Sequence, residues 1–154
     1  DDLSFPNGAH VAEVEIDPET GYSVVVRYVI VEDFGYLLNP MLVEGQVHGG
    51  VVQGLGQAMM ERVVYDENGQ LLTASFMDYG MPRAADVPMF EFNNIVVPST
   101  ANPIGMKGCG EAGTIGSMAA VSNAMMDALA GHNVKIADMP FTPQRVWKML
   151  QAAR

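Results

Sequence analysis

The sequence predicts an α+β fold, with β-hairpins and strands packed against a glycine-rich helix, an Ala/Met-rich helix and a C-terminal helix. Strand-like and helix-like segments do not alternate regularly along the chain, which favours α+β over a doubly wound α/β fold. The chain has 154 residues, of which 49% are hydrophobic and 17% charged, so it can bury the core of one domain. We therefore expect residues 1–154 to form a single domain.

The strands are predicted from alternation and from β-branched residues. Residues 9–16 alternate between apolar and polar side chains, and residues 22–32 are rich in valine. The turn-forming cluster at residues 17–21 lies between them, so the two segments should pair as a hairpin. A second hairpin is expected over residues 63–73, around an Asn-Gly turn, and a further strand over residues 90–97.

Three helices are predicted. Apolar residues recur at helical spacing from Met41 to Arg62, with Asn39-Pro40 as a favourable start. Five glycines interrupt this segment, and each costs about 1 kcal/mol relative to alanine in a helix. We interpret them as places where the backbone approaches a neighbour or a ligand closely. The other two helices are expected over residues 115–129 and 143–153, the last one capped by Thr142.

Charge and composition exclude several classes of partner. The net charge is −10 with only eight basic residues, whereas nucleic-acid binding requires clustered Lys and Arg. No apolar run approaches the roughly 18 residues that cross a bilayer, so no membrane contact is expected. The first residues lack a signal-peptide pattern, and we expect a cytoplasmic protein. A periplasmic location stays open, because a removed signal peptide would leave the same trace.

Protein-ligated metal sites are not expected either. The three histidines share no ligand spacing with one another or with Cys109, the single cysteine. One cysteine also excludes a disulfide within the chain. The chain begins without methionine, and we expect it to be part of something longer.

The loop over residues 107–114 is the first candidate site. Its glycines have G-x-G-x-x-G spacing, but a dinucleotide fingerprint needs a strand directly before it, and Pro98 and Pro103 interrupt that approach. Small residues before a helix N-terminus also let a bulky ligand meet free backbone amides. Glu111 lies there with few side chains to shield it, and a partly dehydrated carboxylate can serve as a general base. The alternative is that Glu111 only balances the helix dipole.

The second candidate site is the glycine-rich helix itself. Gln46, Gln53 and Gln57 are seven and four residues apart, which places them on one helix face. Their amides carry donors and an acceptor that could bind the edge of a heterocycle. The alternative is a buried helix that packs closely on its neighbour.

Taken together, the motifs resemble the C-terminal part of a known enzyme subunit. The chain is similar to the end of the molybdopterin-binding large subunit of the xanthine dehydrogenase, aldehyde oxidoreductase and carbon monoxide dehydrogenase family. Five motifs in one order carry this resemblance: Phe5-Pro6-Asn7-Gly8-Ala9-His10, Asp17-Pro18-Glu19-Thr20-Gly21, Asn39-Pro40, the segment from Gly45 to Gly56, and the segment from Lys107 to Gly116.

The resemblance implies an oxidoreductase of the molybdenum hydroxylase type. Glu111 would be the catalytic base, taking a proton from the water-derived oxygen that is added to an aldehyde or N-heterocycle (purine-like) carbon. Gln46 would bind the pterin, and the backbone of Cys109 and Gly110 would line it, with no protein ligand to the metal from this segment. The cofactor would be molybdopterin with molybdenum, in the cytosine dinucleotide form. Residues 112–114 favour the aldehyde and heterocycle branch over carbon monoxide.

The resemblance also implies partners. They are the remainder of the molybdenum subunit, iron–sulfur and flavin subunits or domains, and a small-molecule substrate. Because the other cofactor-contacting loops lie upstream, we expect the isolated fragment to bind no cofactor and to be inactive. Two other functions stay open at this point: a non-catalytic module that kept the fold for assembly or interaction, and a dinucleotide-binding domain.

Overall fold

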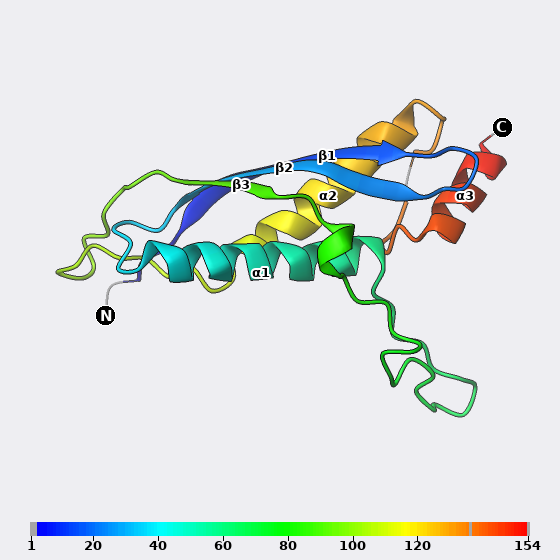
Figure 1. The fold of residues 1–154 in the computed structure, drawn as a ribbon, viewed down its shortest axis with the longest axis horizontal. Coiled ribbons are helices and arrows are strands. Elements are labelled where there is room, and N and C mark those ends of the chain that lie inside the picture. The colour runs from blue at the N-terminus through cyan, green and yellow to red at the C-terminus, as the bar shows by residue number, and fades with distance from the viewer. Residues whose placement is uncertain (1–2, 136, 154) are drawn as a thin grey trace.

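The fold is a three-stranded sheet with two long helices against one face, within the part of the chain that the computed structural model describes, residues 3–135 and 137–153. Both long helices lie on the same side of the sheet, and α3 lies near one end of it (Figure 1). The predicted α+β class is confirmed. The elements in chain order are β1 (Asn7–Ile16), β2 (Ser23–Asp33), α1 (Pro40–Met59), the 3-10 helix η1 (Ala84–Asp86), β3 (Phe90–Asn94), α2 (Ala112–Ala130) and α3 (Pro143–Ala152).

The sheet combines an antiparallel and a parallel pair. β1 and β2 form the predicted hairpin, with a register shift between Glu13 and Val14. β3 pairs with the other edge of β2 in parallel, because the chain crosses over through α1 before it returns. The strand expected over residues 90–97 is shorter than predicted. It ends at Asn94, opposite Glu32, because its partner β2 ends one residue later.

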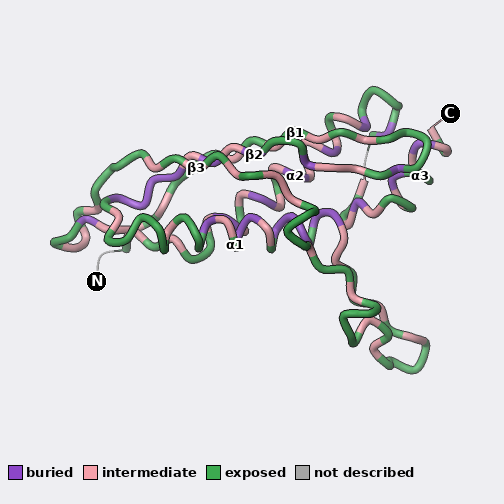
Figure 2. The backbone as a smooth tube through the Cα atoms, in the orientation of Figure 1, coloured by how far each residue is buried: buried purple, intermediate pink, exposed green. Residues whose placement is uncertain are grey.

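The core lies between the sheet and the two long helices. Figure 2 shows buried residues along the middle of the molecule, on the facing sides of these elements. One face of β1 stays exposed, as expected for a sheet that is covered on one side only. The largest buried side chains of the core include Tyr28, Ile30, Phe34, Val47, Val51, Leu55, Val121, Met125 and Leu129.

The glycines of α1 have two different environments. A Cβ built on Gly54 would lie 2.4 Å from Ser117 Oγ and 2.9 Å from the Thr114 carbonyl oxygen of α2. A Cβ built on Gly49 would meet nothing within 4 Å. The close approach inferred from the sequence is therefore confirmed for part of the helix only.

Two of the helices differ from their predicted form. α2 begins at Ala112, three residues before the predicted start, and so includes Gly113. A Cβ on Gly113 would lie 2.5 Å from the Val47 carbonyl oxygen, so contact with α1 outweighs the low helix propensity of glycine there. Thr142 lies at the predicted N-cap of α3, but its side chain makes no capping hydrogen bond. The Asn39 cap of α1 is confirmed, since its side chain accepts from Leu42 N at 3.2 Å.

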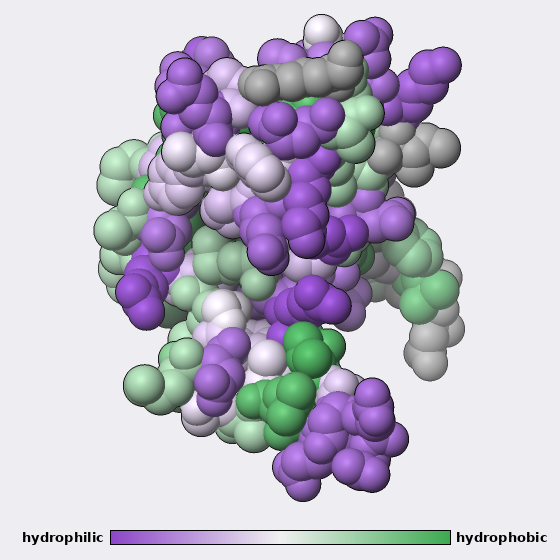
Figure 3. All heavy atoms as spheres, turned by 90° about the vertical axis from the view of Figure 1, so that its right-hand side faces the viewer, coloured by the Kyte–Doolittle hydropathy of each residue, from purple (hydrophilic) through white to green (hydrophobic). Residues whose placement is uncertain are grey.

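The second predicted hairpin, over residues 63–73, has its turn but lacks the two predicted strands. Residues 61–83, here called the arm, project from the body of the molecule (Figure 1). The turn is present, with Asp66 N donating to Gln70 O at 2.9 Å, but Tyr65 and Leu71 form only an isolated bridge. A two-stranded ribbon without a surface to pack on is marginally stable, which explains why longer strands do not form. Figure 3 shows apolar and polar side chains next to one another on this part of the surface.

No helix within the described ranges is both long and apolar enough to cross a bilayer.

We predict opposite effects for two glycine substitutions in α1. Gly54→Ala should lower the free energy of unfolding by about 1 to 3 kcal/mol, because the new methyl group would force α1 and α2 apart. Gly49→Ala should raise it by up to about 1 kcal/mol, because alanine favours the helix and there is open space around it. Urea unfolding followed by circular dichroism measures both. Equal shifts for the two variants would contradict the proposed close contact.

Candidate active site

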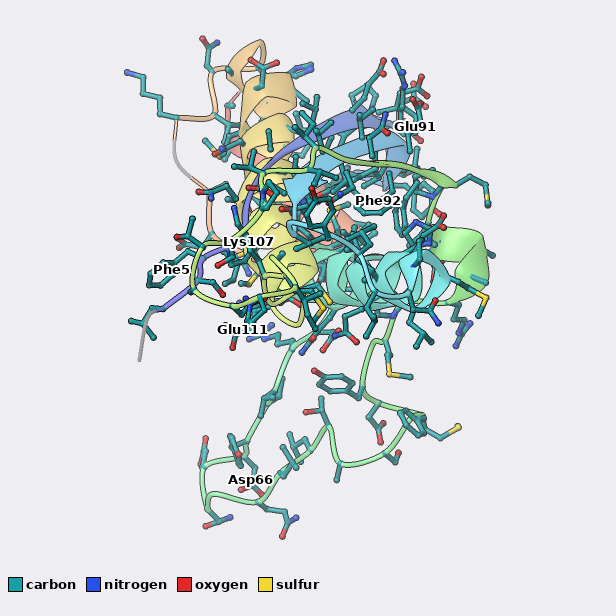
Figure 4. All side chains as sticks on the ribbon, turned by 90° about the vertical axis from the view of Figure 1, so that its left-hand side faces the viewer. Phe5, Asp66, Glu91, Phe92, Lys107 and Glu111 are labelled. Atoms are coloured by element: carbon teal, nitrogen blue, oxygen red, sulfur yellow. The ribbon has the colours of Figure 1, made fainter. Side chains whose placement is uncertain are left out.

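A cavity of about 620 Å³ opens beside the N-terminal half of α2. Three parts of the chain line it: the segment that leads into β1, the glycine loop before α2, and one face of α2. Figure 4 shows Phe5 and Glu111 on this side of the molecule, whereas Asp66 lies far away at the tip of the arm. The cavity therefore includes the loop that the sequence indicated.

Glu111 is the N-cap residue of α2 and lines the cavity. Its side chain makes no capping hydrogen bond, so its carboxylate does not bind the first amides of the helix. A direct hydrogen bond to the helix amides is thus absent, whereas the position of Glu111 at the N-cap still lets its charge favour the helix dipole. The residue is exposed at the cavity, where a ligand could reach it.

The glycines beside Glu111 leave room for a large ligand. A Cβ placed on Gly108 or on Gly110 would meet nothing within 4 Å, and both residues line the cavity. The backbone of the loop is thus open to a bulky group, and the helix N-terminus next to it favours negative charge. These features fit a large anionic cofactor such as a pterin with a phosphate tail.

Gln46 is brought to the same loop. Its Nε2 donates to the Gly110 carbonyl oxygen at 3.2 Å, which ties α1 to the residue before Glu111. A primary amide can form further hydrogen bonds, so this contact leaves Gln46 able to bind a ligand. Gln53 lies two turns further along α1, with its side-chain oxygen next to the Thr114 hydroxyl.

Cys109 differs from the glycines on either side of it in its surroundings. Its side chain packs against the hydrophobic core, and the residue does not line the cavity. The expectation that the backbone of Cys109 lines a cofactor therefore stays a prediction, and the position of its side chain excludes the thiol from the cavity wall.

Sequence reasoning missed a buried polar cluster at the cavity wall. His10 Nε2 lies 2.7 Å from Glu32 Oε1, and His10 Nδ1 lies 2.8 Å from the Tyr28 hydroxyl. The His10 and Glu32 side chains are each only 4% exposed. Alternation along the strands was the available signal, since Tyr28, Ile30 and Glu32 share the inward face of β2.

The hydrogen bonds of the cluster are mutually compatible with the His10 proton on Nε2. Burial raises the pKa of Tyr28, and the nearby Glu32 raises it further, so the phenol stays protonated. Tyr28 can then donate to His10 Nδ1, and His10 Nε2 can donate to the carboxylate. A Cβ on Gly116 would lie 2.6 Å from the His10 ring, so glycine makes room for this arrangement.

The buried ion pair between Lys107 and Asp33 was also missed. Lys107 Nζ donates to Asp33 Oδ2, and the two side chains are 10% and 12% exposed. Asp33 Oδ1 accepts from Gly35 N at 2.9 Å and from Val97 N at 3.1 Å. Burial alone would raise the pKa of Asp33, but the bonds from Lys107 and the two amides outweigh it, so the pKa lies below its ordinary value.

The structure does not support the dinucleotide fingerprint. The glycine loop does not follow a strand directly, because β3 ends at Asn94 and a long irregular segment precedes α2. The nearest strand-like pairing is the isolated bridge between Gly35 and Met106. In the described part of the chain, no group of three or more His, Cys, Asp or Glu side chains is placed to hold a metal ion.

Comparison with known proteins identifies the family. Residues 1–88, more than half of the chain, match the family described as the molybdopterin cofactor-binding domain. The chain belongs to this family. The family assignment made from the order of the motifs is confirmed.

Several relatives match nearly all of the chain. The large subunit of nicotine 6-hydroxylase from Paenarthrobacter nicotinovorans is 45% identical over 92% of the chain, which covers 17% of that protein. Carbon monoxide dehydrogenase from Oligotropha carboxidovorans has a matching fold with a TM-score of 0.92 and 40% identity, over 96% of the chain and 18% of that protein. Quinoline 2-oxidoreductase from Pseudomonas putida 86 gives a TM-score of 0.91 and 44% identity, over 95% of the chain and 19% of that protein.

Two consequences follow from these comparisons. It spans less than a fifth of the length of the relatives it matches, so most of each relative lies outside the segment described above. The similarity to carbon monoxide dehydrogenase is also nearly as high as that to the heterocycle oxidoreductases. The comparisons therefore give no support for placing carbon monoxide last among the substrates.

We predict that the stability contributed by the Lys107–Asp33 pair depends on pH. Asp33→Asn should lower the free energy of unfolding by roughly 1 to 3 kcal/mol at neutral pH, because the hydrogen bond between two charged groups is lost. The pKa of Asp33 is lowered by folding, so its contribution is present above the ordinary aspartate pKa and is lost as the pH falls through the lowered value. The free energies of unfolding of wild type and variant, measured with urea, should thus become similar at acidic pH. A constant difference between pH 7 and pH 3 would contradict the assignment.

Proposed function

We propose that this chain is the C-terminal portion of the large subunit of a molybdenum hydroxylase, and that Glu111 is its catalytic base. The placement of Glu111 carries the proposal. Its carboxylate lines the cavity, makes no bond to the helix amides, and follows Gly110, whose carbonyl oxygen is bonded to Gln46. Resemblance and geometry thus point to the same residue.

The chemistry assigned to Glu111 is proton transfer. Its carboxylate would take the proton from the water-derived oxygen as that oxygen attacks an electron-poor carbon of the substrate. When bound, the molybdenum centre supplies Lewis acidity and accepts the electron pair. Glycines around Glu111 keep the carboxylate accessible, and closure of the cavity by the rest of the subunit would exclude bulk water.

Gln46 and the loop backbone would hold the cofactor. The amide of Gln46 has hydrogen-bonding capacity beyond its bond to Gly110 and could bind the pterin edge. The backbone at Cys109 and Gly110 would lie along the cofactor, because small side chains permit close approach. The cytosine dinucleotide form is the one we propose, on the resemblance alone.

The substrate proposed is an N-heterocycle or an aldehyde. The names of two relatives, nicotine 6-hydroxylase and quinoline 2-oxidoreductase, support a heterocycle. The subunit is proposed to act in the cytoplasm with iron–sulfur and flavin partners. The term "large subunit" or "large chain" in the names of its relatives supports the presence of further subunits.

We predict that Glu111→Gln in the full-length complex lowers kcat by at least 100-fold while molybdenum remains bound. The amide is similar in shape to the carboxylate but cannot accept the proton, and general base catalysis typically contributes 10²- to 10⁴-fold. Steady-state assays combined with metal analysis measure both quantities. Glu91→Gln is the matched control, because Glu91 pairs with Arg27 on the exposed surface of β3. Normal turnover of Glu111→Gln would refute the assignment.

We also predict that residues 1–154, purified alone, bind no molybdenum cofactor and oxidise no substrate. The cavity is open, and its remaining walls would come from the parts of the subunit outside this chain. Elemental analysis and a dye-reduction assay test this expectation. Stoichiometric molybdenum in the purified chain would show that the segment forms a complete binding site by itself.

A further inference from the structure

We propose that Lys107 and Asp33 are positioning residues: their buried ion pair fixes the start of the loop that carries Glu111. This inference rests on the proposed function of Glu111 and adds a device that sets the location of its carboxylate. Neither residue lines the cavity, so any effect on catalysis must act through the loop. Figure 4 shows Lys107 and Glu111 on the same side of the molecule, near the beginning of α2.

The first step is that Asp33 joins three segments of the chain. It is the last residue of β2, and its Oδ1 accepts from Gly35 N at 2.9 Å and from Val97 N at 3.1 Å. Its Oδ2 is bonded to Lys107 Nζ. One carboxylate therefore binds the end of β2, the segment after β3 and the residue that begins the glycine loop.

The second step is that Lys107 is held by its backbone as well. Lys107 N donates to the Phe34 carbonyl oxygen at 2.9 Å, next to Asp33 in the chain. The residue before it, Met106, bridges to Gly35. Main chain and side chain of Lys107 are thus fixed to the same end of the sheet, which determines the point from which the loop departs.

The third step is that the other end of the loop is fixed by α1. Gly113 packs against the backbone at Val47, and Thr114 Oγ1 donates to the Gly50 carbonyl oxygen at 3.1 Å. Between these two ends, Gln46 Nε2 donates to the Gly110 carbonyl oxygen, Ile115 N donates to the Glu111 carbonyl oxygen, and the Cys109 side chain packs against the core. The loop therefore has two fixed ends and a few contacts between them.

The interior of the loop cannot fix its own shape. Gly108 and Gly110 have open space around them, and glycine has access to more backbone conformations than any other residue. Without the anchor at Lys107, the loop could adopt several paths to α2, and Glu111 would be displaced with them. Displacement of a catalytic group by about 1 Å can reduce a rate on the order of 100-fold.

The experiment uses the full-length complex with its cofactor and compares Lys107→Met, Asp33→Asn and the double variant. We expect kcat per molybdenum atom to fall about 10- to 100-fold in each single variant. KM should change much less, because neither residue contacts the substrate. The double variant should have a kcat at least as high as that of the less active single variant, because the two residues act as one unit.

Two further variants separate positioning from a general loss of structure. Lys107→Arg keeps the positive charge and should recover a large part of kcat. Arg27→Gln removes the exposed Arg27–Glu91 pair, whose side chains are 58% and 56% exposed, and should leave kcat unchanged. Limited proteolysis of the loop should be faster in Lys107→Met than in Arg27→Gln.

Unchanged kcat per molybdenum atom in Lys107→Met and Asp33→Asn would overturn the inference, even if less molybdenum were bound. Should those variants fail to assemble, Lys107→Gln and Asp33→Glu give the same readout with milder changes. The Glu111→Gln variant distinguishes a failure of this inference from a failure of the proposed function. An active Glu111→Gln would remove the proposed base, whereas an inactive Glu111→Gln with a normal Lys107→Met would remove only the positioning role.

Discussion

The backbone contact between α1 and α2 is the constraint on which the rest of the structure depends. Gly54 and Gly113 allow the two helices to approach until their main chains touch, and Ser117 Oγ closes the contact by donating to the Val51 carbonyl oxygen at 2.8 Å. A helix pair joined in this way has little freedom to slide or rotate. The N-terminus of α2 is therefore placed by α1, and Glu111 is placed with it.

The one-sided sheet explains where the cavity lies. α2 packs against β1, and one face of α2 lines the cavity together with the segment before β1 and the glycine loop. Polar side chains occupy the inward positions at this end, where His10, Tyr28 and Glu32 bond to one another. Each of these buried polar groups has a partner, so the wall of the cavity can be polar and rigid at the same time.

Elements with a strong local pattern could be predicted from the sequence. The first hairpin, the glycine-rich helix with its Asn39 cap and the final helix all follow from residue spacing. The early start of α2 could not be predicted from local pattern, because it depends on the contact of Gly113 with α1, which is far away in the chain. The Asn-Gly turn is a local signal, and it predicted a hairpin in the arm. The lack of a surface against which the hairpin could pack cannot be read from local sequence.

The same distinction applies to the site. Glu111 and Gln46 were predicted from the order of the motifs, and the structure bonds Gln46 to Gly110, the residue before Glu111. The Lys107–Asp33 pair joins residues that are 74 positions apart, and no local pattern indicates such a pairing.

The arm has a consequence for handling the chain by itself. Phe76 is 80% exposed and Met77 is 92% exposed, although each could bury a large apolar area. Exposed apolar side chains of this size promote self-association until another surface covers them. Proteases also cleave exposed, extended backbone of this kind readily. Yield and solubility of the separate segment would then be limited at a place remote from Glu111, and a shortened arm would be the practical remedy.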